Sequence, residues 1–256
     1  MELSGSIRYE YTFGHFFIPK RMMIKGMDIC GVSYKVTVVI PTLNEEHGIG
    51  STLLDLKNHL KDATYLVVDG FSVDGTVKKA RLLNAEVIQQ DGVGKGRAMA
   101  NALNYIKSDT NYVVFIDADF TYPADCVCRM IEILNNDPNV GMVIGNRFNN
   151  NSTSASLGNI FYFGNRLLAL IQSWLNGVNL NDPLSGLRVL RWDILKDWKP
   201  NSDGFDIEVE LNYYVDKHNL KIVEIPICYR KRLGKKKLSV KHGFTILKRI
   251  LIQSLA

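Results

Sequence analysis

The stretch Tyr112-Val-Val-Phe-Ile-Asp117-Ala-Asp119 joins a run of β-branched and aromatic residues to two closely spaced carboxylates. A short apolar run of this kind, bounded by polar residues, is typical of a buried strand. Residues i and i+2 of an extended segment face the same side, so the side chains of Asp117 and Asp119 converge. The sequence therefore predicts a strand over 112–116 that ends in a pair of acids.

Strands and helices alternate on both sides of this stretch. The alternation predicts an α/β fold, in which a mostly parallel sheet is covered by helices on both faces. We expect this domain to cover residues 36–240, between an N-terminal extension of no assigned role (1–35) and a basic amphipathic tail (241–256). The predicted strands are 36–40, 65–68, 86–89, 112–116, 141–144, 187–190 and 221–229, and the predicted helices are about 45–60, 74–84, one that ends at 105, 123–135, 160–175, 204–217 and 243–255. Thr42 or Asn44 is expected to cap the first of these helices.

The composition is that of a globular protein. Hydrophobic residues make up 46% of the 256 residues and charged residues 22%, which excludes disordered, collagen-like and coiled-coil chains. Four cysteines are too few for a disulfide framework, and Cys126-Val-Cys128 lacks the second pair that a zinc site needs. We therefore expect reduced thiols in a cytoplasmic protein.

The charge is distributed unevenly along the chain. Residues 225–256 contain no acid but nine basic residues, so an acidic body carries a basic tail within a net charge of +5. Such a tail attracts anions, which could be a nucleic acid, a diphosphate or a membrane surface. No run of 18 apolar residues is present, so no transmembrane helix is predicted.

Polar residues also follow the other predicted strands of the sheet. Asn44 and Glu45 follow the first strand and Asp69 ends the second, just as Asp117 and Asp119 follow the fourth. In an open α/β sheet, ligands bind at the carboxyl ends of the strands. Two carboxylates that lie this close favour a hard cation, and Mg²⁺ or Mn²⁺ in turn holds substrate phosphates. The sequence therefore predicts a metal and nucleotide site.

A glycine-rich segment, Gly92-Val-Gly-Lys95-Gly96, precedes one of the predicted helices. Backbone amides at a helix N-terminus together with Lys95 suit a phosphate. The segment matches neither a Walker A loop nor the Gly-x-Gly-x-x-Gly pattern. A tight turn between a strand and a helix is the alternative interpretation.

Taken together, these segments resemble the family 2 glycosyltransferases of GT-A fold, over about residues 36–240. Within that family the chain is most similar to the polyprenyl-phosphate sugar transferases, that is, dolichyl-phosphate mannose synthases and the archaeal dolichyl-phosphate hexosyltransferases of protein N-glycosylation. The segments that carry the resemblance are Ile40-Pro-Thr-Leu-Asn-Glu45, Val68-Asp69 with Ser72-Val-Asp-Gly-Thr76, Gly94-Lys-Gly-Arg-Ala98, Asp117-Ala-Asp119, Asp182-Pro-Leu-Ser-Gly-Leu-Arg188, and Ser202-Asp-Gly-Phe-Asp-Ile-Glu-Val-Glu210.

The resemblance implies a role for each matching residue. The residues expected to bind the nucleotide sugar are Pro41, Leu43, Glu45, Val67, Asp69, Lys95, Asp117, Ala118, Asp119, Thr121, Arg147, Arg188 and Arg232. Asp119, with Asp117, is expected to ligate Mg²⁺ or Mn²⁺. The residues expected to act in catalysis are Asp117, Asp119, Arg147, Arg230 and Lys237, because Arg230, Arg232 and Lys237 fall in a basic loop that closes over the donor diphosphate and the acceptor phosphate.

The expected reaction is an inverting transfer of a hexose from a nucleotide sugar to dolichyl or polyprenyl phosphate, at the inner face of the cell membrane. The donor candidates are UDP-glucose, UDP-N-acetylglucosamine and GDP-mannose. Gly70 stands where the mannose synthases have a second acid after Asp69, and this departure favours a UDP-sugar. A phosphate acceptor is largely ionised near neutral pH, because its second pKa is about 6, so the enzyme needs no strong general base.

Other interpretations remain open at this point. The acceptor could be a soluble or polymeric sugar, and the tail alone could indicate a nucleic-acid-binding protein. We expect no nucleic acid partner, because the tail has no interleaved aromatic residues apart from Tyr229 and Phe244, and the sequence contains no RNA-binding motif.

Two segments are candidates for contact with a membrane surface. The segment 161–175 could be core packing, or a lipid-facing surface that includes Phe161, Phe163 and Trp174. In the tail, Lys241, Lys248 and Arg249 are expected to meet an anionic leaflet.

Overall fold

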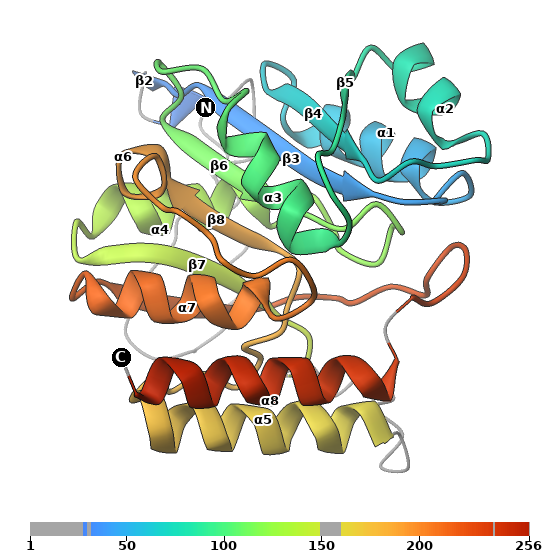
Figure 1. Cartoon of the computed structure of the whole chain (residues 1–256). Helices are drawn as coiled ribbons and strands as arrows, with labels where there is room; N and C mark the ends of the chain where they lie inside the picture. The colour runs from blue at the N-terminus through green and yellow to red at the C-terminus, as the bar shows by residue number, and fades with distance from the viewer. Residues whose placement is uncertain (1–27, 30–31, 149–159, 238, 256) are drawn as a thin grey trace, which may run out of the picture.

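A seven-stranded sheet forms the centre of the computed structural model, which describes residues 28–29, 32–148, 160–237 and 239–255 (Figure 1). The strand order is β5-β4-β3-β6-β8-β7-β9, and every pair of neighbours is parallel except the two that involve β8. The strands are β3 (Val36–Thr42), β4 (Thr64–Asp69), β5 (Glu86–Gln89), β6 (Tyr112–Phe115), β7 (Val140–Asn146), β8 (Arg188–Arg191) and β9 (Lys221–Pro226). The mostly parallel α/β sheet that the sequence predicts is therefore confirmed.

Helices cover both faces of this sheet. The helices are α1 (Ile49–His59), α2 (Thr76–Leu82), α3 (Lys95–Leu103), α4 (Val127–Asn136), α5 (Ile160–Asn176), α6 (Trp192–Leu195), α7 (Ile207–Lys217) and α8 (Val240–Ser254). A two-stranded ribbon, β1 (Asp28–Ile29) and β2 (Val32–Ser33), precedes the sheet. The rest of the N-terminal extension before residue 32 lies outside the described residues.

Alternate residues of the strands enter two separate cores. On one face, Val38 and Ile40 of β3 pack with Leu53 of α1 and Met130 of α4. On the other face, Val39 packs with residues of α3 and α7. Strands that are buried on both sides read as continuous apolar runs, which is why the sequence identifies them.

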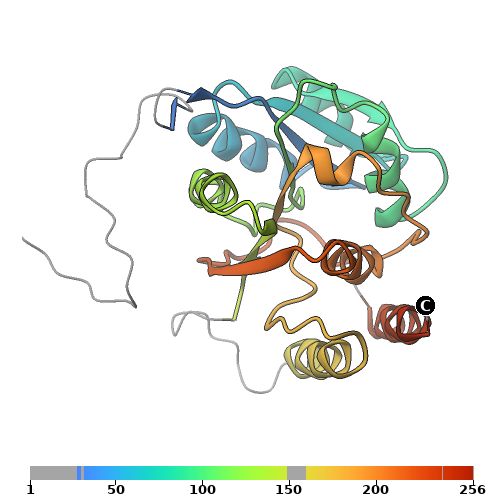
Figure 2. The ribbon, with the colours of Figure 1, turned by 90° about the vertical axis from the view of Figure 1, so that its left-hand side faces the viewer.

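Two long helices form an outer layer beyond α7. Leu168 of α5, Val209 of α7, and Ile246 and Ile250 of α8 make a third apolar cluster. Figure 2 shows α5 and α8 side by side, with α7 between α8 and the sheet. Among the described residues, no helix has both the length and the apolar composition needed to cross a bilayer.

The start of α1 is fixed by contact with the segment that follows β6. The expected capping by Thr42 or Asn44 is wrong, because α1 begins at Ile49 and Gly48 precedes it without a side-chain cap. A Cβ atom at Gly48 would lie 2.5 Å from the carbonyl oxygen of Ala118. The hydroxyl of Thr52 donates to that oxygen at 3.1 Å. The first turn of α1 therefore packs against Ala118, the residue between Asp117 and Asp119.

We predict that Gly48→Ala lowers the free energy of unfolding by about 1–3 kcal/mol, because the added methyl group displaces the backbone around Ala118. Gly50→Ala is the matched control on the same helix: its nearest neighbour would be Leu83 at 4.0 Å, so the same change should stabilise the helix by up to about 1 kcal/mol. Denaturant unfolding measures both, and equal effects from the two variants would contradict the close contact at Gly48.

Candidate functional site

Four acids lie together at the carboxyl edge of the sheet. Glu45 follows β3, Asp69 ends β4, and Asp117 and Asp119 follow β6. Glu45, Asp69 and Asp119 are at most 5% exposed. The structure therefore brings together the acids that the strand ends predicted.

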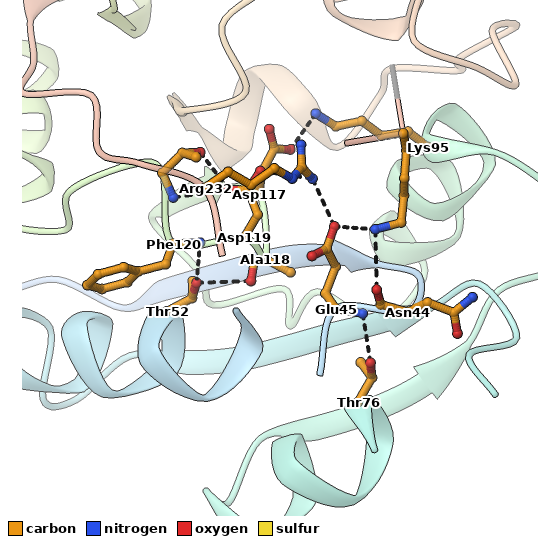
Figure 3. A network of polar contacts seen from close by, with 12 residues as sticks. Asn44, Glu45, Thr52, Thr76, Lys95, Asp117, Ala118, Asp119, Phe120 and Arg232 are labelled. Atoms are coloured by element: carbon orange, nitrogen blue, oxygen red, sulfur yellow. Dashed lines mark hydrogen bonds and ion pairs between the residues drawn. The ribbon is translucent and has the colours of Figure 1, made fainter. Parts of the chain in front are cut away.

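Turns after neighbouring strands are bonded to each other at this edge. Asn44 has a φ of 48°, a conformation that asparagine tolerates in turns. Its backbone N–H donates to the Ser72 hydroxyl and its side-chain oxygen accepts from the Val73 N–H, both at 2.8 Å. The Glu45 N–H donates to the Thr76 hydroxyl at 2.8 Å (Figure 3). These bonds fix where Glu45 stands.

Asp119 is held between a turn of its own segment and a distant arginine. Its Oδ1 accepts from both the N–H and the hydroxyl of Thr121, at 3.0 and 2.5 Å. Its Oδ2 lies 2.9 Å from the guanidinium of Arg232, which also lies 2.9 Å from Glu45 Oε1 (Figure 3). Burial, together with the nearby charge of Asp117, raises the pKa of Asp119 above its ordinary value.

Asp117 is paired with Lys95 at the start of α3. Lys95 Nζ lies 2.6 Å from Asp117 Oδ1 and 2.6 Å from Glu208 Oε1. Burial alone would raise the pKa of Asp117, but the Lys95 ammonium outweighs it and holds that pKa below its ordinary value. The backbone at Gly186 packs against the other oxygen of this carboxylate. A Cβ added at Gly186 would lie 2.4 Å from Asp117 Oδ2, so only glycine fits there.

The glycine-rich segment before α3 therefore differs from the phosphate loop that we expected. The N–H groups of Gly96 and Arg97 donate to the Asp203 carbonyl oxygen, at 2.8 and 3.2 Å. Gly94 has a φ of 108°, and a Cβ there would lie 2.2 Å from the same oxygen. The N–H groups of Gly96 and Arg97 at this helix N-terminus are occupied by the chain itself, and Lys95 is the counter-ion of the partly exposed Asp117 and the buried Glu208. The alternative interpretation, a tight turn, is the one that the structure supports.

A basic loop that follows β9 crosses the acidic edge. We use this term for residues 230–237. Its backbone is bonded to the segment after β6, because the N–H groups of Arg230 and Leu233 donate to the carbonyls of Thr121 and Asp119, at 2.8 and 3.0 Å. Lys237 Nζ contacts Glu45 and lies 3.4 Å from the Asn44 carbonyl oxygen.

The guanidinium of Arg230 pairs with an acid that the sequence did not single out. It lies 2.7 Å from Asp55 of α1 and 4.5 Å from the centre of the Phe120 ring. The three basic residues expected at the site, Arg230, Arg232 and Lys237, therefore all pair with acids at or beside the carboxyl edge.

Arg147 and Arg188 are both held by the segment 182–186, in different ways. Arg147 follows β7, and its guanidinium makes two hydrogen bonds to the Asp182 carboxylate, at 2.7 and 2.6 Å. Arg188 is fully buried and donates to the carbonyl oxygens of Ser185 and Pro183 and to Asn212. The structure thus places Arg188 as a buried support of the segment 182–186, since its guanidinium bonds to that segment and to Asn212.

The residues expected to bind the nucleobase differ in their exposure. Leu43 is 39% exposed and Pro41 is half-buried, whereas the Val67 side chain is fully buried in the core. Asp69 Oδ2 accepts from the Ser72 N–H at 3.0 Å, but its Oδ1 is buried without a hydrogen-bond partner. An unpartnered buried carboxylate oxygen is costly, and a donor from a bound ligand would satisfy it.

The donor set at Asp117 and Asp119 fits a divalent metal ion only in part. Among the described residues, no group of three or more His, Cys, Asp or Glu side chains could hold a metal ion. Mg²⁺ commonly takes one or two carboxylates, with substrate phosphates and water as its remaining ligands. The Arg232 guanidinium lies 2.9 Å from Asp119 Oδ2, so this oxygen already faces a positive charge. The residues therefore suit a metal that is shared with a diphosphate.

Four acids that form ion pairs in and around this site were not predicted from the sequence. Asp55 and Asp182 hold Arg230 and Arg147, and Glu208 and Asp206 lie at the start of α7. Three of them lie in two segments that carry the family resemblance, which begin at Asp182 and Ser202. The positions of these acids in the sequence do not indicate which basic residue each of them pairs with.

Arg249 does not face outward as expected. Its guanidinium lies 3.0 Å from Asp206 and 3.8 Å from Glu210, and its side chain is only 17% exposed. It therefore attaches α8 to α7. Lys241 and Lys248 remain exposed.

Comparisons with known proteins agree with this architecture. A model of the family described as glycosyl transferase family 2 matches residues 37–196. A dolichyl-phosphate hexose transferase of Haloferax volcanii is 33% identical over 207 residues, 79% of this chain and 86% of that protein. The glycosyltransferase AglJ of the same organism is 32% identical over 77% of this chain and 63% of its own length. For a dolichol-phosphate mannosyltransferase of Pyrococcus furiosus the identity is 27%, over 84% of this chain and 62% of that protein. The chain thus spans less than two thirds of the length of two of these three relatives.

Solved structures match the fold at lower identity. Glucosyl-3-phosphoglycerate synthase from Mycobacterium tuberculosis, in complex with Mn²⁺, UDP and glucosyl-3-phosphoglycerate, aligns with a TM-score of 0.69 at 21% identity, covering 86% of this chain and 80% of that one. The same protein, in complex with Mn²⁺ and UDP-glucose, aligns with a TM-score of 0.68. These likenesses confirm the GT-A fold.

We predict that Arg188→Met lowers the free energy of unfolding by roughly 3 kcal/mol, because it leaves the Ser185 carbonyl oxygen and the Asn212 side-chain oxygen without the Arg188 donor, and leaves the Pro183 carbonyl oxygen with Asn212 as its donor. Thermal unfolding measures this loss. A variant of unchanged stability that had lost nucleotide affinity would instead place Arg188 in the binding site itself.

Proposed function

Because the chain belongs to glycosyl transferase family 2, we propose that it transfers a hexose from a nucleotide sugar to dolichyl or another polyprenyl phosphate, for protein N-glycosylation. The observation that carries the proposal is the basic loop bound across Glu45 and Asp119. A reaction between a nucleoside diphosphate sugar and a phosphate acceptor brings several negative charges together. The basic loop and the two acids supply the cations, and the metal ligands, that such a reaction needs.

The donor we favour is a UDP-sugar, with UDP-glucose, UDP-N-acetylglucosamine and GDP-mannose as the candidates to compare. The free Oδ1 of Asp69 is suited to accept a hydrogen bond from the base or the ribose. Gly70 lies against Gln90, since a Cβ there would be 3.2 Å from its side-chain oxygen, so little room is left for a second acid. Support also comes from the structural neighbours, which were solved with UDP and UDP-glucose.

Mg²⁺ or Mn²⁺ would be held by Asp119 and Asp117. When bound, the metal would supply positive charge that stabilises the departing nucleoside diphosphate. The structural neighbours contain Mn²⁺ or Mg²⁺ together with UDP, which supports a divalent ion in this fold.

The chain's own residues position the reactants. In our mechanism an oxygen of the acceptor phosphate attacks the anomeric carbon and the bond from that carbon to the diphosphate oxygen breaks, which inverts the configuration. Arg230 and Lys237 orient the acceptor phosphate, and Arg147, fixed by Asp182, faces the sugar and phosphate. Because the acceptor is already ionised, positioning and charge neutralisation account for the rate.

A lipid acceptor lies in a membrane, so the enzyme needs a face that contacts the membrane surface. Helices α5 and α8 offer such a face. Exposed apolar side chains recur at helical spacing along α5, at Phe163, Leu167, Leu170 and Trp174. On α8 they are joined by Phe244 and the exposed lysines 241 and 248, and neither helix contains an acid. We place this face on the inner leaflet of the cell membrane. Leu168 and Gln172 face inward, so α5 combines both interpretations left open by the sequence; the side chain of Phe161 lies outside the described residues.

The test of the proposed function is a donor screen with labelled UDP-glucose, UDP-N-acetylglucosamine and GDP-mannose, in the presence of dolichyl phosphate and Mg²⁺ or Mn²⁺. We expect label in the lipid extract. Label that stays with a soluble acceptor such as phosphoglyceric acid, which is bound in one structural neighbour, would instead favour the soluble-acceptor alternative.

We predict that Asp119→Asn lowers kcat by about 10²- to 10³-fold, because it removes a charge that faces the metal and the diphosphate. Asp125→Asn makes the same change in an exposed residue six positions further along the chain and should leave kcat unchanged. Near-normal turnover in the Asp119 variant would rule out the metal site.

We predict that replacing Lys241 and Lys248 together with alanine weakens binding to vesicles that contain anionic lipid, each lysine contributing about 1 kcal/mol. The loss should shrink at high salt, which screens these charges. Vesicle co-sedimentation measures the effect, and the control replaces Lys107 and Lys199, two exposed lysines outside α5 and α8. Equal weakening by both pairs would contradict a specific membrane-facing surface.

A further inference from the structure

Lys95 bridges two acids from different parts of the fold. Its Nζ lies 2.6 Å from Asp117 Oδ1 and 2.6 Å from Glu208 Oε1, and its side chain is 12% exposed. Glu208 is itself 4% exposed, and its second oxygen, Oε2, is buried without a hydrogen-bond partner. One buried ammonium is thus shared by two carboxylates, only one of which belongs to the Asp117–Asp119 pair.

The backbone enforces this arrangement. A Cβ at Gly94 would lie 2.2 Å from the Asp203 carbonyl oxygen, and one at Gly96 would lie 2.0 Å from that of Ser202. The start of α3 is therefore in backbone contact with the segment that leads into α7. Contact this close sets the distance between Lys95, at the start of α3, and Glu208, in the first turn of α7.

The other acids at the start of α7 face a different partner. Asp206 and Glu210 meet Arg249 of α8, and Glu210 also accepts hydrogen bonds from the Asn201 N–H and the Ser202 hydroxyl. Glu208 is thus the acid of this turn that is directed toward the site, whereas Glu210, two residues on, serves the packing of α8.

The net charge of the cluster formed by Lys95, Asp117 and Glu208 depends on Glu208, while Arg232 and Arg147 add positive charge near Asp117. A pair of Lys95 and Asp117 alone would be neutral and would attract a divalent cation weakly. With Glu208 the three groups carry one net negative charge in a poorly hydrated place, where charge acts strongly. The second carboxylate also restrains Lys95, which would otherwise be free to turn toward the donor phosphates.

We propose that Glu208 is a positioning residue of the transfer site, which acts through Lys95 to keep Asp117 oriented and the site attractive to the metal. The inference rests on the proposed function, because it takes the metal and the diphosphate as the ligands of this edge. Groups that orient metal ligands typically change metal affinity or activity by about 10- to 100-fold when they are removed.

The experiment measures Mn²⁺ binding in the presence of UDP, by calorimetry and by electron paramagnetic resonance, in the full-length chain. Glu208→Gln keeps the side-chain volume and removes the charge, and we expect it to raise the dissociation constant of Mn²⁺ by about tenfold. Glu210→Gln is the matched control: it should lower the melting temperature by weakening the contact with Arg249, while the Mn²⁺ dissociation constant stays within about twofold of wild type.

A double-mutant cycle identifies the route through Lys95. In a Lys95→Met background, Glu208→Gln should cost less Mn²⁺ affinity than it does in the wild-type background, because the effect that passes through Lys95 is already absent. The double variant should also melt at a higher temperature than Lys95→Met alone, since it leaves one fewer buried, unpaired charge. If Glu208→Gln alone does not fold, this second measurement tests the pairing of Glu208 with Lys95, and the Mn²⁺ dissociation constant of the double variant tests the effect on the metal: a value equal to that of wild type overturns the proposal.

The outcomes separate the two proposals. A wild-type protein that binds neither Mn²⁺ nor UDP overturns the proposed function, and this inference with it. Wild-type binding that is unchanged in a folded Glu208→Gln variant overturns the role of Glu208 alone. Equal losses from Glu208→Gln in the wild-type and Lys95→Met backgrounds would also overturn it, because Glu208 would then act independently of Lys95.

Discussion

Buried negative charge at the carboxyl edge of the sheet is the constraint on which the rest of this structure depends. Burying a carboxylate costs several kcal/mol unless a cation or a set of hydrogen-bond donors compensates it. Parallel strands bring Glu45, Asp117 and Asp119 together, and the compensating cations come from distant segments. Lys95 arrives from the start of α3, and Arg232 and Lys237 arrive from the basic loop after β9. The path of the chain over the edge follows from this need.

The same charges explain how the site can accept its ligands. The basic loop lies on the acids that we assign to the metal and the nucleotide. Asp119 would hold a divalent ion, and Arg232, which pairs with this carboxylate at 2.9 Å, would supply positive charge to the phosphates. The acids that pair with the basic loop can therefore hold a metal ion, and the basic side chains of the loop can hold the diphosphate.

Helix α7 connects this edge to the outer layer. On one side Arg249 of α8 reaches Asp206 and Glu210. On the other, Gln172 of α5 accepts a hydrogen bond from Asn212, which in turn holds Arg188 beneath the segment 182–186. The exposed face of α5 and α8 is therefore attached to the site through polar side chains as well as through the apolar cluster. A membrane that orients these two helices would also orient the edge of the sheet.

The sequence by itself determined the strands, the mostly parallel sheet and the position of the acids, because these depend on local patterns. A buried strand is a short apolar run, and the residue that follows it must lie at the sheet edge. Only the tertiary structure decided which charge meets which. Lys95 has the local features of a phosphate ligand, yet it pairs with Asp117 and Glu208, and Arg249 turns inward although its neighbours Lys248 and Lys241 are exposed. The physical reason is that an ion pair depends on distances between segments remote in sequence, which backbone contacts such as that of Gly96 with Ser202 set only when the chain has folded.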